Sequence, residues 1–357
     1  MKTIPEARKD IESIDSQIIR LLAERQECAR VIGENKRAVG ANVFVPEREE
    51  ELLRKLEKLA NELEIPHANI RAIYREIISA SVALQMQRPI AYLGPEGTFT
   101  HQAARRNFGG SVELMPVRTI AEIFEAVRRD VAAYGVVPAE NSNAGAVVNA
   151  LDALAESDLT IVAQIQLKVE QALIATGSLA EIKTVMSRDI ALAQCSEWLM
   201  HHLPDAHLVP VDSTAAAVAE AAKDPSIAAI ASEVAAEINR VPVLERRIQN
   251  SKTNFTRFFV VGKKPNAHCT LCEEKTSIVV FVKNEPGTLL GALEPFSKRG
   301  INLSRIESRP SRQRAWEYLF FIDFIGSTDD PKVREALDEL RGKCVSIKNL
   351  GSYPNVE

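Results

Sequence analysis

The first residues that could do chemistry are cations on the apolar face of a helical segment near the start of the chain. Continuing the three- and four-residue steps of that face places Arg8, Arg25 and Lys36 on or beside it. The face itself is formed by Ile11, Ile14, Ile18, Leu21, Leu22, Ala29 and Ile32. Polar groups on a packed face cost free energy unless they are paired. The pattern therefore predicts either cations that reach solvent from a helix end or a pocket for a small anion.

Two later helical segments carry polar groups in the same way. Ser81 and Gln85 continue the apolar stripe of the third segment, and Arg48 and Glu49 lie one turn before Leu52 on the second. Several coincident cases favour the anion pocket, with donors from three helical segments converging on it.

The spacing of Arg8 and Arg25 limits how the two can act together. They lie 17 residues apart on one helix, which is roughly 25 Å along its axis. One small-molecule pocket cannot use both side chains from the same copy. The spacing therefore predicts a dimer with interlocked helices, in which Arg8 reaches the partner's pocket.

In the middle of the chain, several strand-like runs end in small polar residues that open a helix. Each is individually explained as a helix N-cap. Together they favour a binding edge, because strand ends and helix N-termini meet at one edge of a parallel sheet and attract anions. The region has neither G-x-G-x-x-G nor G-x-x-x-x-G-K-[ST], which argues against a nucleotide. The segments are Gly94–Thr98, Glu140–Gly145, Ser187–Asp189, Asp212–Thr214 and Ser232–Glu233.

A hydroxyl and a guanidinium stand side by side at Thr256 and Arg257, where an apolar strand-like run begins. This pair suits a substrate with carboxylates; an edge-strand arginine is the plain alternative. Further on, the turn Glu285–Leu290 and the segment Ile306–Pro310 contain nothing that suggests catalysis.

Three styles of sequence must position these groups. Residues 1–88 show helical periodicity only, with breaks at Gly33–Pro46 and Ile65–Pro66. In residues 89–265, short apolar runs alternate with Ala-rich helical segments, which predicts an α/β domain. After a linker, residues 274–357 follow the order β-α-β-β-α-β, which is the ferredoxin-like α+β arrangement.

Composition excludes several classes of protein. The 357 residues are 46% hydrophobic and 26% charged, with a formal net charge of −4. This balance predicts a globular protein that does not bind nucleic acid. No apolar run is long enough for a membrane span and no signal peptide precedes the first segment, so we expect a cytoplasmic location.

The five cysteines suit free thiols, and the single C-x-x-C of Cys269 and Cys272 favours a linker over a metal or redox site.

The helical region resembles the all-helical chorismate mutases. The resemblance rests on Ala7-Arg8-Lys9, Leu21 to Arg25, Lys36, Pro46 to Glu49 and Ser81 to Gln85. It implies that Arg25, Lys36, Arg48 and the Arg8 of a second copy hold the carboxylates and ether oxygen of chorismate. It also implies that Glu49, Ser81 and Gln85 contact the hydroxyl and ether region, and that the reaction is a rearrangement to prephenate. Val45 departs from the family, some of whose members carry an acidic residue there.

The middle region resembles prephenate dehydratase, through the turn at Gly94–Thr98, the loop at Glu140–Gly145 and the motif at Asn254–Phe258. The resemblance implies a two-lobed fold like the periplasmic binding proteins, with the site in the cleft. Thr256 would assist loss of the ring hydroxyl, Arg257 would anchor a carboxylate, and Glu140 is a candidate proton source. The same resemblance implies that the cleft is lined by Glu140, Asn141, Ser187, Gln194, Ser213 and Thr214.

The last region resembles the ACT regulatory domain of prephenate dehydratases. The resemblance rests on two short motifs and implies that they bind phenylalanine between two domains. The first motif is Gly287, Thr288, Leu289 and Leu290, and the second is Glu307, Ser308, Arg309 and Pro310. A plain dimer contact is the alternative for the edge that carries Arg309.

As a whole, the chain is similar to the bifunctional chorismate mutase/prephenate dehydratases with a C-terminal ACT domain. The resemblance implies an enzyme of phenylalanine biosynthesis that converts chorismate through prephenate to phenylpyruvate without metal or organic cofactor. It also implies feedback inhibition by phenylalanine and a homodimer or larger homo-oligomer. An amino-acid-sensing binding protein and an enzyme with only one active half are the alternatives.

Overall fold

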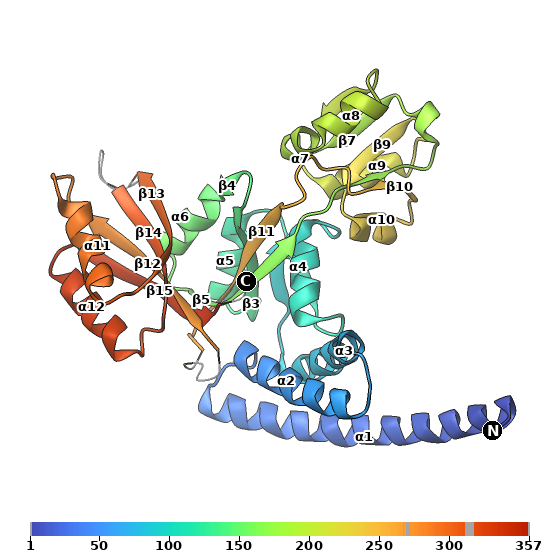
Figure 1. Cartoon of the computed structure of the whole chain (residues 1–357), viewed down its shortest axis with the longest axis horizontal. Coiled ribbons are helices and arrows are strands. Elements are labelled where there is room, and N and C mark those ends of the chain that lie inside the picture. Colours follow the sequence, from blue (N-terminus) through green and yellow to red (C-terminus); the bar gives the residue numbers. More distant parts are fainter. Residues whose placement is uncertain (1, 267, 269–271, 311–317, 356–357) are drawn as a thin grey trace. The chain divides into compact units, whose positions relative to one another are not determined.

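A computed structural model of the chain describes residues 2–266, 268, 272–310 and 318–355. The chain separates into two compact units, and Figure 1 shows the elements of both. The first unit is Met1–Pro89 with Phe108–Glu113, and the second is Ile90–Asn107 with Leu114–Glu357.

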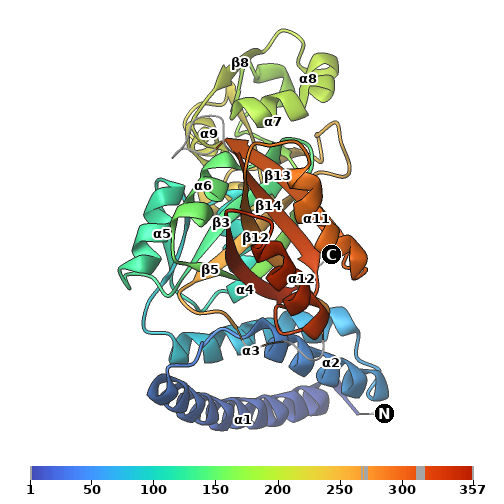
Figure 2. The same cartoon turned by 90° about the vertical axis from the view of Figure 1, so that its left-hand side faces the viewer.

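The first unit is built on three helices, α1 (Ile4–Val39), α2 (Pro46–Glu62) and α3 (His67–Gln85), which lie side by side in Figure 2. The side chain of Thr3 accepts from the backbone N–H of Glu6 and caps α1, which ends at Gly40 with a φ of 64°. The sequence predicts a break between the first two helices at Gly33–Pro46. The start of that range is wrong, because α1 continues through Gly33 and ends at Val39. The second break, at Pro66, falls where expected.

The apolar stripe of α1 is exposed in the single chain. Ile11 and Ile14 are 56% and 52% exposed, and Leu21 is 63% exposed. The stripe is therefore open in the single chain, and the dimer expected from the spacing of Arg8 and Arg25 stays a prediction. A row of large apolar side chains left open to water marks a surface that a further partner would cover.

The second unit begins with a six-stranded sheet in the order β2-β1-β3-β11-β5, with β4 paired to β3. Strands β1, β2 and β3 are parallel, and β11 runs antiparallel between β3 and β5. The elements are β1 (Ile90–Leu93), α4 (Phe99–Phe108), β2 (Leu114–Val117), α5 (Ile120–Arg128), β3 (Tyr134–Asn141), β4 (Gly145–Ala146), α6 (Val148–Glu156), β5 (Thr160–Lys168) and β11 (Phe255–Gly262).

A second lobe holds a five-stranded sheet in the order β10-β6-β9-β7-β8. The chain enters this lobe after β5 and returns before β11, so two crossings join the lobes. Its elements are β6 (Ala172–Ile174), a 3-10 turn (Leu179–Glu181), β7 (Thr184–Ser187), α7 (Asp189–Gln194), α8 (Ser196–His202), β8 (His207–Pro210), α9 (Thr214–Ala221), β9 (Ile227–Ala231), α10 (Glu233–Asn239) and β10 (Val243–Arg246). The two-lobed α/β expectation is confirmed.

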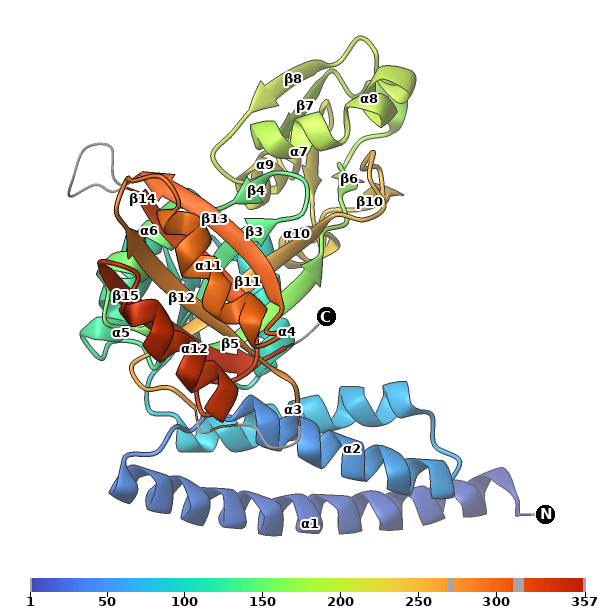
Figure 3. The same cartoon turned by 60° about the vertical axis from the view of Figure 1, so that its left-hand side comes forward.

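The last part of the chain forms an antiparallel sheet in the order β13-β14-β12-β15. Figure 3 shows α11 and α12 on one face of that sheet. This is the expected ferredoxin-like arrangement. Its elements are β12 (Glu274–Val282), α11 (Thr288–Lys298), β13 (Leu303–Pro310), β14 (Tyr318–Ile325), α12 (Pro331–Arg341) and β15 (Ser346–Pro354).

The ferredoxin-like sheet shares an apolar core with the six-stranded sheet. Phe259 of β11 meets the ring of Tyr353 on β15, with ring centroids 5.9 Å apart, and Tyr353 is fully buried. The hydroxyl of Thr160 donates to the carbonyl of Leu350 at 2.8 Å. The face opposite α11 and α12 thus packs against the lobe that holds the six-stranded sheet, which we call the dehydratase-like lobe after the resemblance of its motifs.

Two other expectations concern membranes and cysteines. No helix among the described residues is both long and apolar enough to span a bilayer. Cys28, Cys195 and Cys344 are free thiols as expected, whereas Cys272 is disulfide-bonded, so the expectation is wrong for that residue. Cys269, the other cysteine of the C-x-x-C pair, lies outside the described residues.

Candidate active sites

In the helical unit, Arg25 and Ser81 are brought together by the packing of α1 on α3. Arg25 Nη1 donates to the Ser81 hydroxyl, and that hydroxyl donates to the carbonyl of Ile77 at 2.9 Å. Gln85 lies one turn further along α3, and its Oε1 is buried with no hydrogen-bond partner among the described residues. A buried amide oxygen without a partner is costly unless a ligand satisfies it.

Gly33 allows α1 to approach Gln85 closely. A methyl group on Gly33 would lie 2.8 Å from Cγ of Gln85. Any larger residue would displace the amide that the site is expected to use, and this gives a reason for glycine inside a long helix.

Lys36 and Glu49 form the second part of this site. Lys36 Nζ donates to the carbonyl of Val43 at 2.9 Å, and burial lowers the pKa of Lys36 while Glu49 opposes that shift. Burial raises the pKa of Glu49 to about 7, an effect that the nearby charge of Lys36 reduces and that of Glu47 increases. Glu49 can therefore be a neutral hydrogen-bond donor near neutral pH.

Two of the predicted cations are not gathered with these residues. The Arg48 side chain is 68% exposed and forms an ion pair with Glu51, so its expected inward orientation is wrong in the single chain. Arg8 is exposed on the N-terminal half of α1.

In the second unit, strand pairing brings the two dehydratase-like motifs together. Thr256 pairs with Asn141 and Arg257 pairs with Glu140 across β11 and β3. Because β11 is antiparallel to β3, the start of β11 meets the carboxyl end of β3. The sheet therefore juxtaposes residues about 115 positions apart in the sequence.

Asn141 fixes the direction in which the Thr256 hydroxyl can act. Its Oδ1 accepts from the backbone N–H groups of Asn143 and Ala144, both at 3.0 Å. Its Nδ2 is therefore the donor toward Thr256 Oγ1, at 2.9 Å. Since the hydroxyl oxygen already accepts this bond, its own hydrogen is available for a ligand.

Asn254 extends the network to the second lobe. The Asn254 side chain is buried, its Oδ1 accepts from Asn141 Nδ2 at 2.7 Å, and its Nδ2 donates to Gln194 Oε1 at 3.1 Å. Gln194, at the end of α7, is thus brought to the same network as Thr256, although its amide oxygen is engaged by Asn254.

Arg257 lies between two carboxylates. Its Nη1 donates to Asp323 of β14 at 3.0 Å and lies 3.6 Å from Glu140 Oε2. The same Glu140 oxygen lies 3.4 Å from Nε of Arg305 on β13. The expected neighbours Arg257 and Glu140 do meet, and the last domain adds two charged partners to them.

The remaining cleft residues have structural roles in this conformation. Ser187 is fully buried and donates to the carbonyl of Ile230 at 2.6 Å, so the expectation that it lines a cleft is not met. Ser213 caps α9 by accepting from the N–H of Ala216 at 3.0 Å, as the plain N-cap interpretation predicts. Thr214 is buried at the first position of α9.

The two effector motifs lie at the same end of the ferredoxin-like sheet. The register aligns Val282, Tyr318 and Pro310 in one row across β12, β14 and β13. The turn after β12 and the end of β13 are therefore separated only by the width of β14, with about 4.8 Å between neighbouring strands.

The first motif presents an open turn. Gly287 has a φ of 84° and a Cβ added there would meet no atom within 4 Å. The hydroxyl of Thr288 donates to the carbonyls of Lys283 and Glu285 at 2.7 and 2.9 Å. Leu289 is partly buried, whereas Leu290 is 74% exposed.

The second motif alternates along β13. Glu307 and Arg309 are partly buried, and Ser308 and Pro310 are exposed. Arg309 Nη2 lies 3.3 Å from both carboxylate oxygens of Asp152 on α6. The guanidinium of this motif therefore faces the dehydratase-like lobe, which favours a contact between domains over an exposed edge.

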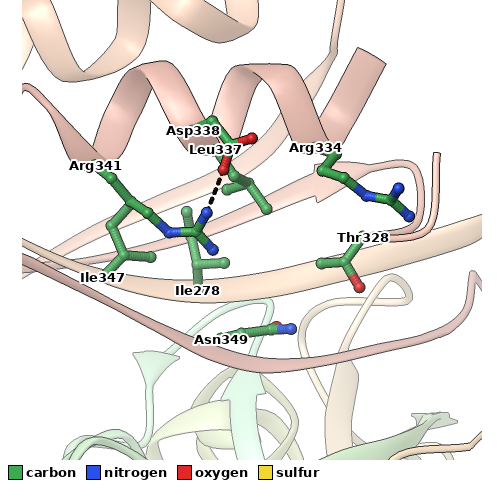
Figure 4. A pocket seen from close by; sticks show the side chains of 8 residues that line it. All are labelled: Ile278, Thr328, Arg334, Leu337, Asp338, Arg341, Ile347 and Asn349. Atoms are coloured by element: carbon green, nitrogen blue, oxygen red, sulfur yellow. Dashed lines mark hydrogen bonds and ion pairs between the residues drawn. The ribbon is translucent and has the colours of Figure 1, made fainter. Parts of the chain in front are cut away.

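A separate cavity of about 350 Å³ lies on the last domain, beside α12. Figure 4 shows Arg341 turned toward Asp338 at one end of it and Arg334 at the other. Neither effector motif lines this cavity. Its lining is Ile278, Thr328, Arg334, Leu337, Asp338, Arg341, Ile347 and Asn349.

Sequence reasoning did not single out Asn254, Asp323 and Arg305. Asn254 stands two residues before Thr256 and was visible only as part of that motif. Asp323 had a clearer signal, because it is the one acidic residue in the apolar run Tyr318–Ile325, where an unpaired charge would be costly.

Among the described residues, no group of three or more histidine, cysteine, aspartate or glutamate side chains is arranged to hold a metal ion. The geometry offers cations, amides and hydroxyls in the helical unit, and a hydroxyl, an amide and an arginine in the two-lobed part.

Three family descriptions match successive parts of the chain. Residues 7–86 match chorismate mutase type II, residues 90–266 match prephenate dehydratase and residues 276–342 match the ACT domain.

Relatives match over nearly the full length. The chain is 44% identical to the bifunctional chorismate mutase/prephenate dehydratase of Aquifex aeolicus, covering 99% of this chain and 98% of that protein. It is 37% identical to the protein of the same description from Pseudomonas aeruginosa, with 97% and 96% covered. Among solved structures, prephenate dehydratase from Arthrobacter aurescens in complex with L-Phe is 34% identical, with a TM-score of 0.71 over 75% of this chain and 90% of that chain.

Proposed function

Because this chain belongs to the family of bifunctional chorismate mutase/prephenate dehydratases with an ACT domain, we propose which of its residues perform the two reactions and their control. The enzyme rearranges chorismate to prephenate and then dehydrates and decarboxylates prephenate to phenylpyruvate. Feedback control by phenylalanine is supported by the L-Phe complex of the related dehydratase.

The mutase step needs no nucleophile and no proton transfer. The reaction is accelerated by holding a compact conformer and by stabilising charge on the ether oxygen. We assign Arg25 and Lys36 to the carboxylates and ether oxygen, because Arg25 is held by Ser81 of α3 and the charge of Lys36 interacts with that of Glu49 on α2. Gln85 is the donor for the ether region through its amide nitrogen, and the burial of its side chain against Gly33 of α1 supports that role. Glu49 contacts the substrate hydroxyl, with Ser81 holding Arg25.

The dehydratase step couples loss of the ring hydroxyl to loss of CO₂. Aromatisation drives it, so the site must assist the leaving hydroxyl and bind the side-chain carboxylate. The hydroxyl of Thr256 is oriented by Asn141 so that its hydrogen can be donated to the leaving oxygen. This hydrogen bond is the observation that carries the assignment. Arg257 anchors a carboxylate, and Glu140, next to it, is the proton source.

We assign effector binding to Gly287–Leu290 and Glu307–Pro310. Their alignment at one end of the sheet, and the open space around Gly287, support a site for a small amino acid. The exposed Leu290 supports completion of that site by a second copy of the domain.

A homodimer is proposed for the mutase site. The exposed stripe of α1 and the distance between Arg8 and Arg25 both support an interlocked arrangement in which Arg8 enters the partner's pocket. Arg8→Ala and Arg25→Ala should each be inactive, and mixing the two under subunit exchange should restore part of the mutase activity. Demonstrated exchange without recovery would overturn the shared site.

The direct test of the proposed function is incubation with chorismate. Wild-type enzyme should consume it, pass through prephenate and release phenylpyruvate, and phenylalanine should slow the second step. A chain that only senses an amino acid would bind phenylalanine and leave chorismate unchanged. An enzyme with one active half would stop at prephenate or accept only prephenate.

A further inference from the structure

Two charged side chains of the ACT domain reach the residues assigned to bind prephenate. Asp323 accepts from Arg257 Nη1 at 3.0 Å, and Arg305 lies 3.4 Å from Glu140. With the Arg257–Glu140 distance of 3.6 Å, two carboxyl groups and two guanidinium groups alternate in one cluster. We call Asp323, Arg257, Glu140 and Arg305 the charge cluster.

The cluster is held mainly from the ACT side. Asp323 and Arg305 have side chains only 2% and 7% exposed, compared with 25% for Arg257 and 30% for Glu140. Asp323 Oδ1 also accepts from the hydroxyl of Ser277 at 2.6 Å, which ties the carboxylate to β12. Both ACT members are thus buried and Asp323 is fixed to β12, while the dehydratase members are more exposed.

One face of β13 joins the cluster to the second effector motif. Arg305, Glu307 and Arg309 alternate along the strand, so their side chains share a face. Arg305 Nη2 lies 4.0 Å from Glu307, and Arg309 pairs with Asp152 of α6. A small movement of β13 would therefore change the contacts of Glu140 and of α6 together.

We propose that Asp323 is a positioning residue for Arg257, and that Asp323 and Arg305 couple the effector site to prephenate binding. This inference rests on the proposed function of both sites. A guanidinium shared between Asp323 and a substrate carboxylate changes its affinity for the substrate when Asp323 moves. Bound effector can alter that sharing without contacting the substrate, and any such coupling must be reciprocal.

The test uses the full-length chain and two charge-removing variants, Asp323→Asn and Arg305→Gln. The measured quantity is the prephenate KM at saturating phenylalanine divided by the KM without it. We expect this KM ratio to fall by at least about fivefold in both variants and to come close to one. An effect of about fivefold is the low end of ordinary allosteric coupling. Without effector, Asp323→Asn should raise KM while kcat changes by less than about threefold, because Arg257 binds a carboxylate and moves no proton.

Three readouts separate the possible causes. Mutase activity of the same variants reports that the helical unit is folded, and calorimetry with phenylalanine reports that the ACT domain is folded and its effector site intact. Asp338→Asn is the matched control, because this carboxylate of the same domain pairs with Arg341 on α12 and is 61% exposed. Its coupling ratio should equal that of wild type.

Each outcome decides between the proposals. Lost coupling with retained phenylalanine binding supports the inference. An unchanged ratio in both variants, with wild type still inhibited, overturns the inference and leaves the proposed function standing. A wild-type enzyme whose dehydratase is insensitive to phenylalanine overturns the proposed regulation and the inference with it.

Discussion

The side-chain amide of Asn141 donates to the hydroxyl of Thr256 at 2.9 Å, and this bond leaves the hydroxyl hydrogen of Thr256 free to act on substrate. Strand pairing sets the contact, since the two residues are direct partners across β3 and β11.

Removing the amide of Asn141 should impair the dehydratase selectively. Asn141→Ala leaves the Thr256 hydroxyl free to rotate, and loss of a preoriented donor lowers kcat by about 10²- to 10³-fold. Prephenate turnover measures this directly. Asn143→Ala in the same loop is the matched control, because only its backbone N–H contacts Asn141. Equal losses in the two variants would contradict the role given to Asn141.

Glu49 should make mutase activity depend on pH. Burial raises its pKa to about 7, so it is neutral below that pH and ionised above it. An ionised carboxylate repels a doubly negative substrate, and we expect mutase kcat/KM to fall as pH rises through about 7. Glu49→Gln should give a flatter profile. A wild-type profile without any change between pH 6 and 8, on the order of one unit either side of that pKa, would count against this assignment.

Gly287 should be required for inhibition. Gly287→Ala would place a methyl group in the open space assigned to phenylalanine, and we expect the concentration for half-inhibition to rise at least about tenfold. The φ of 84° adds backbone strain, so a control that is also in the left-handed region is needed. Gly300→Ala supplies it, since Gly300 has a φ of 62° and open space around it. Similar inhibition in both variants would place the effector elsewhere.

The contact between the ACT domain and the dehydratase lobe should contribute to stability. Gly351 has a φ of 132°, and a Cβ there would overlap the carbonyl oxygen of Ile161 on β5. Gly351→Ala should destabilise the second unit by about 2 to 4 kcal/mol. Gly291→Ala, inside α11 with open space around it, should instead stabilise by about 0.5 to 1 kcal/mol. Thermal unfolding midpoints distinguish the two directions, and a lower midpoint for Gly291→Ala alone would contradict the packing.

The sequence was sufficient for the fold class and for the order of the three family regions. Periodicity identifies helices and strands because burial on one face is a local property of the pattern. Thr256 and Arg257 were identified from their motif, but their partners Asn141 and Glu140 meet them through a strand pairing that spans more than a hundred residues. Nothing local in the sequence specifies such a register.

One question stayed open and one prediction failed, for physical reasons that the pattern cannot express. The stripe of α1 has the period of a packed face, but the pattern does not say whether the partner is in the same chain, and here Ile11 and Ile14 are exposed. Arg48 has the right phase to face inward, yet it stands in the first turn of α2, where its side chain reaches water and pairs with Glu51. The position of Arg48 in the first turn of α2 therefore explains why its side chain is exposed.

The contact of Asp323 and Arg305 with the candidate site was also not predicted. Asp323 and Arg305 come from a domain expected only to sense an effector, and both lie within ion-pair distance of dehydratase residues. The apolar core shared by Phe259 and Tyr353 likewise argues against a fully independent dehydratase lobe.

The central claim is that one chain carries two separate active sites. The most direct measurement follows chorismate, prephenate and phenylpyruvate together in Gln85→Ala and Thr256→Ala. Gln85→Ala should leave chorismate almost unconsumed and still convert added prephenate at close to the wild-type rate. Thr256→Ala should consume chorismate normally and accumulate prephenate. Equal loss of both reactions in either folded variant would contradict the claim.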